Sequence, residues 1–241
     1  RPVIGEALDK CRQSLSLARP GPAGFAGRSV TLGLSDDFEI ALGREAIAAL
    51  AEAAPGLRLI FRQTHSRLAA DMLMARDVDL VIASGGLTAP ALQRVTVGQG
   101  DYACLVDPAS LAPGQEALSV EDFTGRAHVL VSSGGFIGVV DEVLHAQGLT
   151  RRVLAATTHF AALAFLLRGG DVLATLPTHA ARGLAAVAGL RLLPCPVAMP
   201  GYAIEMGWRA DALRDEAVAV ARLSLLGLLQ GYGWAAAPGA R

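Results

Sequence analysis

The sequence predicts an α/β protein with two Rossmann-like lobes. Short apolar strands alternate with amphipathic helices through the first half of the chain, and the same alternation starts again at residues 128–131. The strands are almost continuously apolar, which is typical of parallel strands covered by helices on both faces. Two such runs in tandem favour two lobes with a cleft between them over one undivided sheet.

Composition favours a globular protein over a disordered, membrane-spanning or nucleic-acid-binding one. The 241 residues are 52% hydrophobic with a formal charge of −1, which indicates a globular chain. No apolar run reaches the roughly 18 residues of a membrane span, and residues 1–11 do not resemble a signal peptide. We therefore expect a soluble, cytoplasmic protein that does not bind a membrane. The near-neutral charge also argues against nucleic-acid binding by this chain alone.

The three cysteines give a further indication of the compartment. Cys11, Cys104 and Cys195 are odd in number, far apart and without CxxC spacing. This pattern argues against a disulfide framework or a zinc site, and a reducing cytoplasm is the default expectation.

Residues 2–19 are predicted to form an amphipathic linker helix that is separated from the rest by Pro20-Gly21-Pro22. Its apolar residues follow the 4-3-4-3 spacing of a coiled-coil seam: Ile4, Leu8, Cys11, Leu15 and Ala18. Because so short a helix is marginal alone in water, the seam needs either a partner helix or the globular body to pack on. Since the chain begins inside this helix, we expect further residues upstream in the natural protein.

The first lobe is organised around residues 28–50, a buried strand that turns directly into a helix. Val30, Leu32 and Leu34 alternate with small residues, and Ser35-Asp36-Asp37 supplies N-cap chemistry. Further along the first half of the chain we predict strands at 57–62, 79–83, 92–97 and 102–106 and a helix at 67–76, of which the strand at 102–106 lies beyond the first lobe.

The second lobe repeats this pattern after residue 127. We predict strands at 128–131, 152–156, 171–176 and 190–193, and helices at 136–147, 159–168 and 178–184. A last strand at 201–209 and a long helix at 211–230 complete the chain.

Small polar residues recur where a predicted strand gives way to a helix. Hydroxyls and free helix N–H groups at such turns suit a neutral or anionic small molecule, although ordinary capping explains any one turn equally well. Asp36 and Asp37 would repel an anion, so we expect Asp37 to face solvent or a cation. The turns are Ser35-Asp36, Thr64-His65-Ser66, Ser84-Gly85, Ser132-Ser133-Gly134-Gly135 and Thr157-Thr158-His159.

No catalytic motif is recognisable. The sequence lacks GxSxG, P-loop, HExxH and SxxK patterns, and its five histidines have no catalytic spacing. Gly98-x-Gly100-x-x-Ala103 superficially fits a dinucleotide fingerprint, but a strand follows the glycines where that motif needs a helix. We interpret these glycines as a flexible crossing between lobes, and we predict no enzyme activity, no metal and no cofactor.

The order and spacing of several segments resemble the linker helix and effector-binding region of LysR-type transcriptional regulators. These segments are VTLGLSDDFE, AEAAPGLRLIFRQ, RDVDLVIA, GxxDEVLxxxGLxRRV and GGDVLATLPTHAARGL. The resemblance implies two lobes like those of type 2 periplasmic binding proteins, with the chain crossing between them near Gly98–Asp101 and Pro200–Gly201. Expected boundaries are 1–19 for the linker helix, 28–99 and 202–233 for lobe I, and 100–201 for lobe II.

The resemblance also implies a function and a set of contact residues. A small metabolite would bind between the lobes, contacting Ser35, Asp36, Thr64, His65, Ser132, Ser133, Gly135, Phe136, His159 and Phe160, to which the turn at Ser84 adds a further hydroxyl. The expected partners are this effector, a second copy in a homodimer or tetramer, and DNA through a winged helix-turn-helix that is absent from the chain. Phe136, Phe160 and His65 are either pocket-lining or core residues.

Two other functions fit parts of the sequence. A type 2 solute-binding protein of a transporter would share the fold, but it has no use for a coiled-coil seam. An enzyme on a two-lobed scaffold ranks third, because no catalytic spacing is present.

Overall fold

The computed structural model describes residues 24–132 and 134–234. The predicted linker helix and Ser133 therefore lie outside the described residues. The described chain divides into two compact units, one made of residues 24–34, 44–97 and 205–232 and the other of residues 35–43, 98–204 and 233–234. Each unit carries its own sheet, as predicted for an α/β protein with two lobes.

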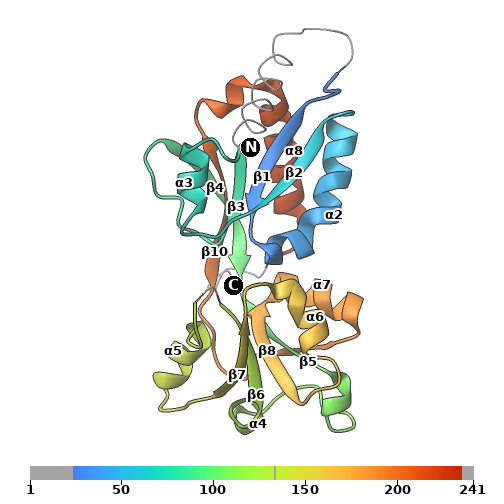
Figure 1. The fold of residues 1–241 in the computed structure, drawn as a ribbon, viewed down its shortest axis with the longest axis vertical. Helices are drawn as coiled ribbons and strands as arrows, with labels where there is room; N and C mark the ends of the chain where they lie inside the picture. Colours follow the sequence, from blue (N-terminus) through green and yellow to red (C-terminus); the bar gives the residue numbers. More distant parts are fainter. Residues whose placement is uncertain (1–23, 133, 235–241) are drawn as a thin grey trace, which may run out of the picture. The chain divides into compact units, whose positions relative to one another are not determined.

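The first sheet has the order β2-β1-β3-β10-β4 (Figure 1). Its strands are β1 (Ser29–Leu34), β2 (Arg58–Gln63), β3 (Leu80–Ala83), β4 (Leu92–Gly100) and β10 (Tyr202–Arg209). β1 pairs in parallel with β2 and β3, whereas β10 runs antiparallel to β3. The sheet is thus mixed, with the predicted parallel core extended by a strand that returns from the end of the chain.

Helices flank the first sheet. α2 (Asp36–Ala53) connects β1 to β2, α3 (Ala69–Met74) connects β2 to β3, and α8 (Glu216–Gly231) follows β10 through η3 (Ala212–Arg214). The chain passes from β1 to its neighbour β2 on one side and then returns to β3 on the other side of β1. Right-handed crossovers in these two opposite directions place α2 and α3 on opposite faces of the sheet (Figure 1). Both faces of β3 are consequently buried, which explains its uninterrupted apolar sequence.

The second sheet has the order β7-β6-β8-β5-β9. Its strands are β5 (Tyr102–Val106), β6 (Ala127–Val131), β7 (Arg152–Thr157), β8 (Val172–Pro177) and β9 (Arg191–Pro194). β6 pairs in parallel with β7 and β8, and β5 runs antiparallel to β8 and β9.

Helices cover both faces of this second sheet. They are α4 (Val120–Gly125), α5 (Val139–His145), α6 (Leu163–Leu166) and α7 (Thr178–Ala188), with the short turns η1 (Pro108–Ser110) and η2 (Phe160–Ala162). β5 shows how the two cores are separated. Ala103 and Leu105 pack with α6 and α7, whereas Cys104 and Val106 pack with α4 and α5. Alternate residues of one strand therefore contribute to opposite cores.

Two predicted helices differ from the structure. The helix expected over 136–147 begins only at Val139, because the Asp141 side chain accepts the Gly138 N–H (2.7 Å) and caps the helix there. Phe136 and Ile137 consequently lie outside the helix. The helix expected over 159–168 is a short 3₁₀ turn followed by one α-helical turn.

Gly98 and Gly100 belong to β4 and have a packing role. A Cβ atom at Gly98 would lie 2.3 Å from the Trp234 ring, and one at Gly100 would lie 2.2 Å from the Tyr202 ring. Glycine is therefore needed at both positions because aromatic rings approach the strand closely. The sequence interpretation of these glycines as a flexible crossing did not include this packing role.

Cys104 and Cys195 are close in space although 91 positions separate them. Their sulfur atoms lie 3.6 Å apart and both thiols are free. The antiparallel pairing of β5 with β9, which places Cys104 opposite Leu193, brings them together.

Candidate functional site

The turn from β1 into α2 carries the first predicted contact residue, Ser35. Its carbonyl accepts the N–H groups of Phe38 (3.1 Å) and Glu39 (3.2 Å), so Ser35 occupies the N-cap position of α2. Its hydroxyl donates to an oxygen of Asp37. Because that hydroxyl proton is used within the turn, the oxygen of Ser35 retains lone pairs for a donor on another molecule.

Asp37 is buried, so the first of the two predicted alternatives, that it faces solvent, is wrong, and its side chain faces the imidazole of His179. It is 3% exposed, and its Oδ2 lies 3.0 Å from Nε2 of His179, which is 4% exposed. The Phe38 ring stacks on the His179 ring at 4.7 Å between centroids. The start of α2 is thus joined to α7 by a buried polar pair and a ring stack. This pair has no local signal in the sequence, because 142 positions separate its members.

Asp36 joins the same turn to the one that follows β7. Its Oδ2 accepts the N–H of Ala161 at 3.1 Å. Burial raises the pKa of Asp36, and the hydrogen bond from Ala161 partly offsets this effect. The predicted residues His159 and Phe160 directly precede this contact. His159 is exposed, and Phe160 packs against the core of the second unit.

The turns after β6 and β7 also meet. The N–H of Ser132 donates to the carbonyl of Thr157 at 2.8 Å, and the Ser132 hydroxyl accepts the N–H of Gly134 at 3.3 Å. Gly135 has a φ of 142°, a conformation that favours glycine. Within the second unit, hydrogen bonds therefore connect Ser132 to the turn at Thr157–His159, and Asp36 to Ala161, which lies shortly after that turn.

The first unit holds the other two predicted turns. Thr64 donates its N–H to the carbonyl of Leu34 (2.9 Å) and is 2% exposed, and its hydroxyl has no hydrogen-bond partner among the described residues. Gly86, two residues after Ser84, approaches this turn so closely that a Cβ atom would lie 2.9 Å from the Ser66 carbonyl oxygen. A buried hydroxyl without a partner is costly, so Thr64 is suited to hydrogen-bond a bound molecule.

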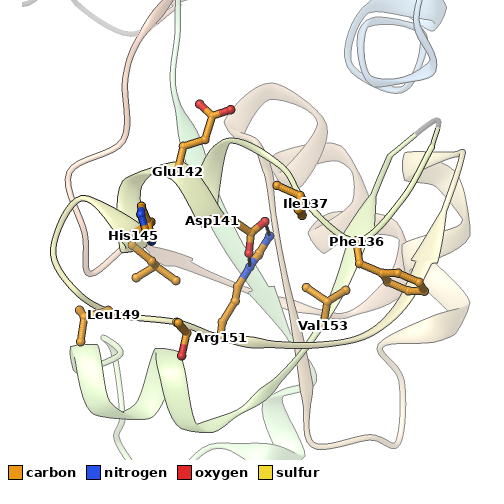
Figure 2. A pocket seen from close by; sticks show the side chains of 10 residues that line it. Phe136, Ile137, Asp141, Glu142, His145, Leu149, Arg151 and Val153 are labelled. Atoms are coloured by element: carbon orange, nitrogen blue, oxygen red, sulfur yellow. Dashed lines mark hydrogen bonds and ion pairs between the residues drawn. The ribbon is translucent and has the colours of Figure 1, made fainter.

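A separate pocket of about 530 Å³ lies in the second unit, beside α5 (Figure 2). Phe136 is the only one of the described predicted contact residues that lines it. The pocket is formed by Phe136, Ile137, Asp141, Glu142, Leu144, His145, Leu149, Thr150, Arg151 and Val153. Apart from Phe136, none of these residues was predicted from the sequence to contact a ligand; most lie in the predicted helix 136–147 and strand 152–156, and Leu149, Thr150 and Arg151 lie between them.

Residues 24–132 and 134–234 contain no group of three or more His, Cys, Asp or Glu side chains arranged to hold a metal ion. Within those same ranges no helix is both long enough and apolar enough to cross a lipid bilayer.

Comparison with known proteins agrees with this architecture. The model of the LysR substrate binding domain matches residues 23–228. The transcriptional activator NahR of Pseudomonas putida is 31% identical over 190 residues, which are 78% of this chain and 63% of NahR. The solved regulatory domain of MexT, a transcriptional activator in Pseudomonas aeruginosa, is 32% identical with a TM-score of 0.74, covering 83% of this chain and 98% of that domain.

A further solved structure shares the fold at lower sequence identity. The effector binding domain of BenM, solved with its effector benzoate, has a TM-score of 0.66 at 15% identity and covers 88% of this chain and 97% of that domain.

These findings define the class of protein as a two-lobed regulatory domain. The chain belongs to the LysR substrate-binding-domain family, as its sequence motifs indicated. It spans about 63% of the length of NahR. The matches are to transcriptional regulators, and they do not favour the transporter or enzyme alternatives.

Proposed function

We propose that this chain senses a small-molecule effector for a LysR-type transcriptional regulator. In this proposal the effector is held by the turns at the carboxyl ends of the strands, and DNA is bound by a winged helix-turn-helix outside this chain. The observation that carries the proposal is that predicted turns meet in the second unit, where Asp36 accepts the N–H of Ala161 and Ser132 donates its N–H to the carbonyl of Thr157. Strand ends of this kind are the usual ligand-binding edge of an α/β sheet.

The chemistry of the turns favours an effector that both donates and accepts hydrogen bonds. Ser35 presents lone pairs, because its proton is directed at Asp37, whereas the hydroxyl of Thr64 is uncommitted among the described residues. Asp36 adds negative charge near the second-unit turns. An aromatic acid, such as the benzoate named for BenM, is a suitable first probe if its carboxylate is placed away from Asp36.

Signalling would follow from a shift in population between two arrangements of the lobes. An effector that contacts both lobes favours one arrangement, and it must bind that arrangement several kcal/mol more tightly to switch it fully. The predicted lobe boundaries at 28–99, 100–201 and 202–233 and the cleft between the lobes are part of this proposal.

We further propose that the chain forms a homodimer through exposed apolar side chains. β2 and β7 are the edge strands of their sheets, and they expose Ile60 (47%) and Leu154 (58%). α2 exposes Ile47 and α6 exposes Phe165 (82%). Apolar groups at unprotected sheet edges are typical of surfaces that a second copy covers.

A thermal-shift screen tests the sensing proposal. Benzoate and other aromatic acids, amino acids and flavonoid-like compounds are added to the chain and to its Ser35→Phe variant. A ligand present at a hundred times its Kd stabilises the folded state by about 2.7 kcal/mol, which a melting curve resolves. We expect stabilisation of the parent that Ser35→Phe abolishes.

The matched control is Ala186→Phe, which places the same ring at an exposed position of α7. This variant should melt and respond to ligand like the parent. Equal stabilisation of Ser35→Phe and the parent by the same compound would contradict the proposed role of the turns, as would a screen in which no compound stabilises the parent.

A further inference from the structure

The pocket beside α5 is formed entirely by one stretch of the second unit, residues 136–153. Its volume of about 530 Å³ is within the range of pockets that hold small organic molecules. Figure 2 shows Arg151 reaching up to Asp141 at the centre, with Phe136 and Leu149 at opposite ends. The pocket is distinct from the hydrogen-bonded cluster of turns, with which it shares only the loop that carries Phe136.

The centre of the pocket is a rigid ion pair. The Arg151 side chain is 1% exposed, and its Nε and Nη2 each donate to Asp141 at 2.8 Å. Nη1 lies 3.1 Å from Nδ1 of His128, and Asp141 also accepts the N–H of Gly138 at 2.7 Å. A bidentate pair with further hydrogen bonds is held in one geometry, so this part of the pocket is preorganised.

The walls around the pair are largely apolar. Leu144 is fully buried beneath it, and Leu149 and Val153 are half-buried at its sides. Phe136 and Ile137 are 61% and 77% exposed, because α5 begins only after them. Large apolar side chains that remain in water beside a pocket favour an occupant that covers them, and a ring system gives such cover with little loss of conformational freedom.

The charges of the lining disfavour an anionic ligand. Asp141 neutralises Arg151, which leaves the carboxylate of Glu142 as the excess charge. No described residue forms an ion pair or side-chain hydrogen bond with Glu142. An incoming carboxylate would meet this negative charge, which in the lining only a protonated His145 would offset, whereas an ammonium group or a neutral donor would be attracted.

We propose that this pocket is a second ligand site, which binds a ring-containing amphiphile that is cationic or uncharged. Its preference differs from that of the strand-end turns, which suit neutral or anionic molecules. The regulatory domain would then take two chemically different ligands at two sites of the same chain.

Three probes that share one ring and differ in charge test the proposal: 2-naphthylmethylamine, 2-naphthylmethanol and 2-naphthoate. Amide chemical shifts of the 241-residue chain are followed during titration with each probe. We expect the amine and the alcohol to shift amides within 136–153 and to bind at least about tenfold more tightly there than the naphthoate. Naphthoate binding in this stretch as tightly as the amine would overturn the proposal.

Variants separate the pocket from its surroundings. Thr150→Trp fills the pocket from an exposed position, and Leu149→Trp is a second filling variant should the first disturb folding. Each should weaken amine binding by about tenfold or more, whereas Gln147→Trp, at an exposed position that does not line the pocket, should change it by less than about twofold. Glu142→Gln, which removes the excess negative charge, should narrow the difference in affinity between the amine and the naphthoate. Unchanged amine binding in a folded filling variant would refute the site.

Discussion

Protonation of His128 should destabilise the second unit in a defined pH range. The side chain is fully buried on β6, with Nε2 2.7 Å from the Phe123 carbonyl and Nδ1 3.1 Å from Nη1 of Arg151. Because an arginine nitrogen only donates, Nδ1 must accept, and Nε2 must carry the proton that Phe123 accepts. Both ring nitrogens are thus satisfied in the neutral form, and a second proton would point at a guanidinium.

The size of the effect follows from the pKa. Burial is the main cause that lowers the pKa of His128 from 6.5 to about 4, and the charge of Arg151 adds to it. This difference corresponds to about 3 kcal/mol. Above pH 6.5 the imidazole is neutral in both states and contributes no pH dependence. As the pH falls from 6.5 towards 4, the unfolded chain binds the proton and the folded chain does not, so the free energy of unfolding decreases.

Urea unfolding between about pH 7 and about pH 4 measures this loss, and His128→Gln is the control. Glutamine retains an N–H donor for the Phe123 carbonyl but does not titrate. The difference in unfolding free energy between parent and variant should therefore shrink by up to about 3 kcal/mol as the pH falls. Parallel pH profiles of the two proteins would refute the assignment of a buried neutral imidazole.

Three substitutions test the packing of the structure by urea unfolding. Arg151→Met leaves a carboxylate without its partner and should cost about 3 kcal/mol, whereas Arg152→Met at the exposed neighbour should cost little. Gly100→Ala forces a methyl group into a tyrosine ring and should cost about 2 kcal/mol, whereas Gly125→Ala, with open space around it, should be nearly neutral. His179→Ala removes the partner of the buried Asp37 side chain and should lower the free energy of unfolding by about 3 kcal/mol. A loss of unfolding free energy below about 1 kcal/mol in Arg151→Met, Gly100→Ala or His179→Ala would contradict the packing described.

Most of the strands were predictable because their signal is local. β3 and β8 are short apolar runs between turn residues, and their predicted bounds agree with the structure to within one residue. The antiparallel positions of β5 and β10 were not predicted, because pairing depends on residues far apart in the chain. α4 was missed although Ser119 and Asp122 form a capping box that signals its start.

The candidate site was predictable only in part. Small polar residues at strand ends made Ser35, Asp36 and Ser132 candidates, because the residue types that favour turns are recognisable from neighbouring positions; their contact with a ligand stays a prediction. The burial of Asp37 against His179 has no such signal, since it depends on how α2 and α7 pack. The pocket beside α5 was missed because the apolar periodicity extended the helix back to Phe136, whereas capping by Asp141 starts it at Val139.

Amide hydrogen exchange, with and without a compound that stabilises the chain in the thermal-shift screen, tests the sensing proposal most directly. Binding at the strand ends predicts slower exchange in residues 34–38, 64–66, 84–86, 132–136 and 157–161. Slower exchange confined to residues 137–153, or to surfaces away from every one of these turns, would contradict it.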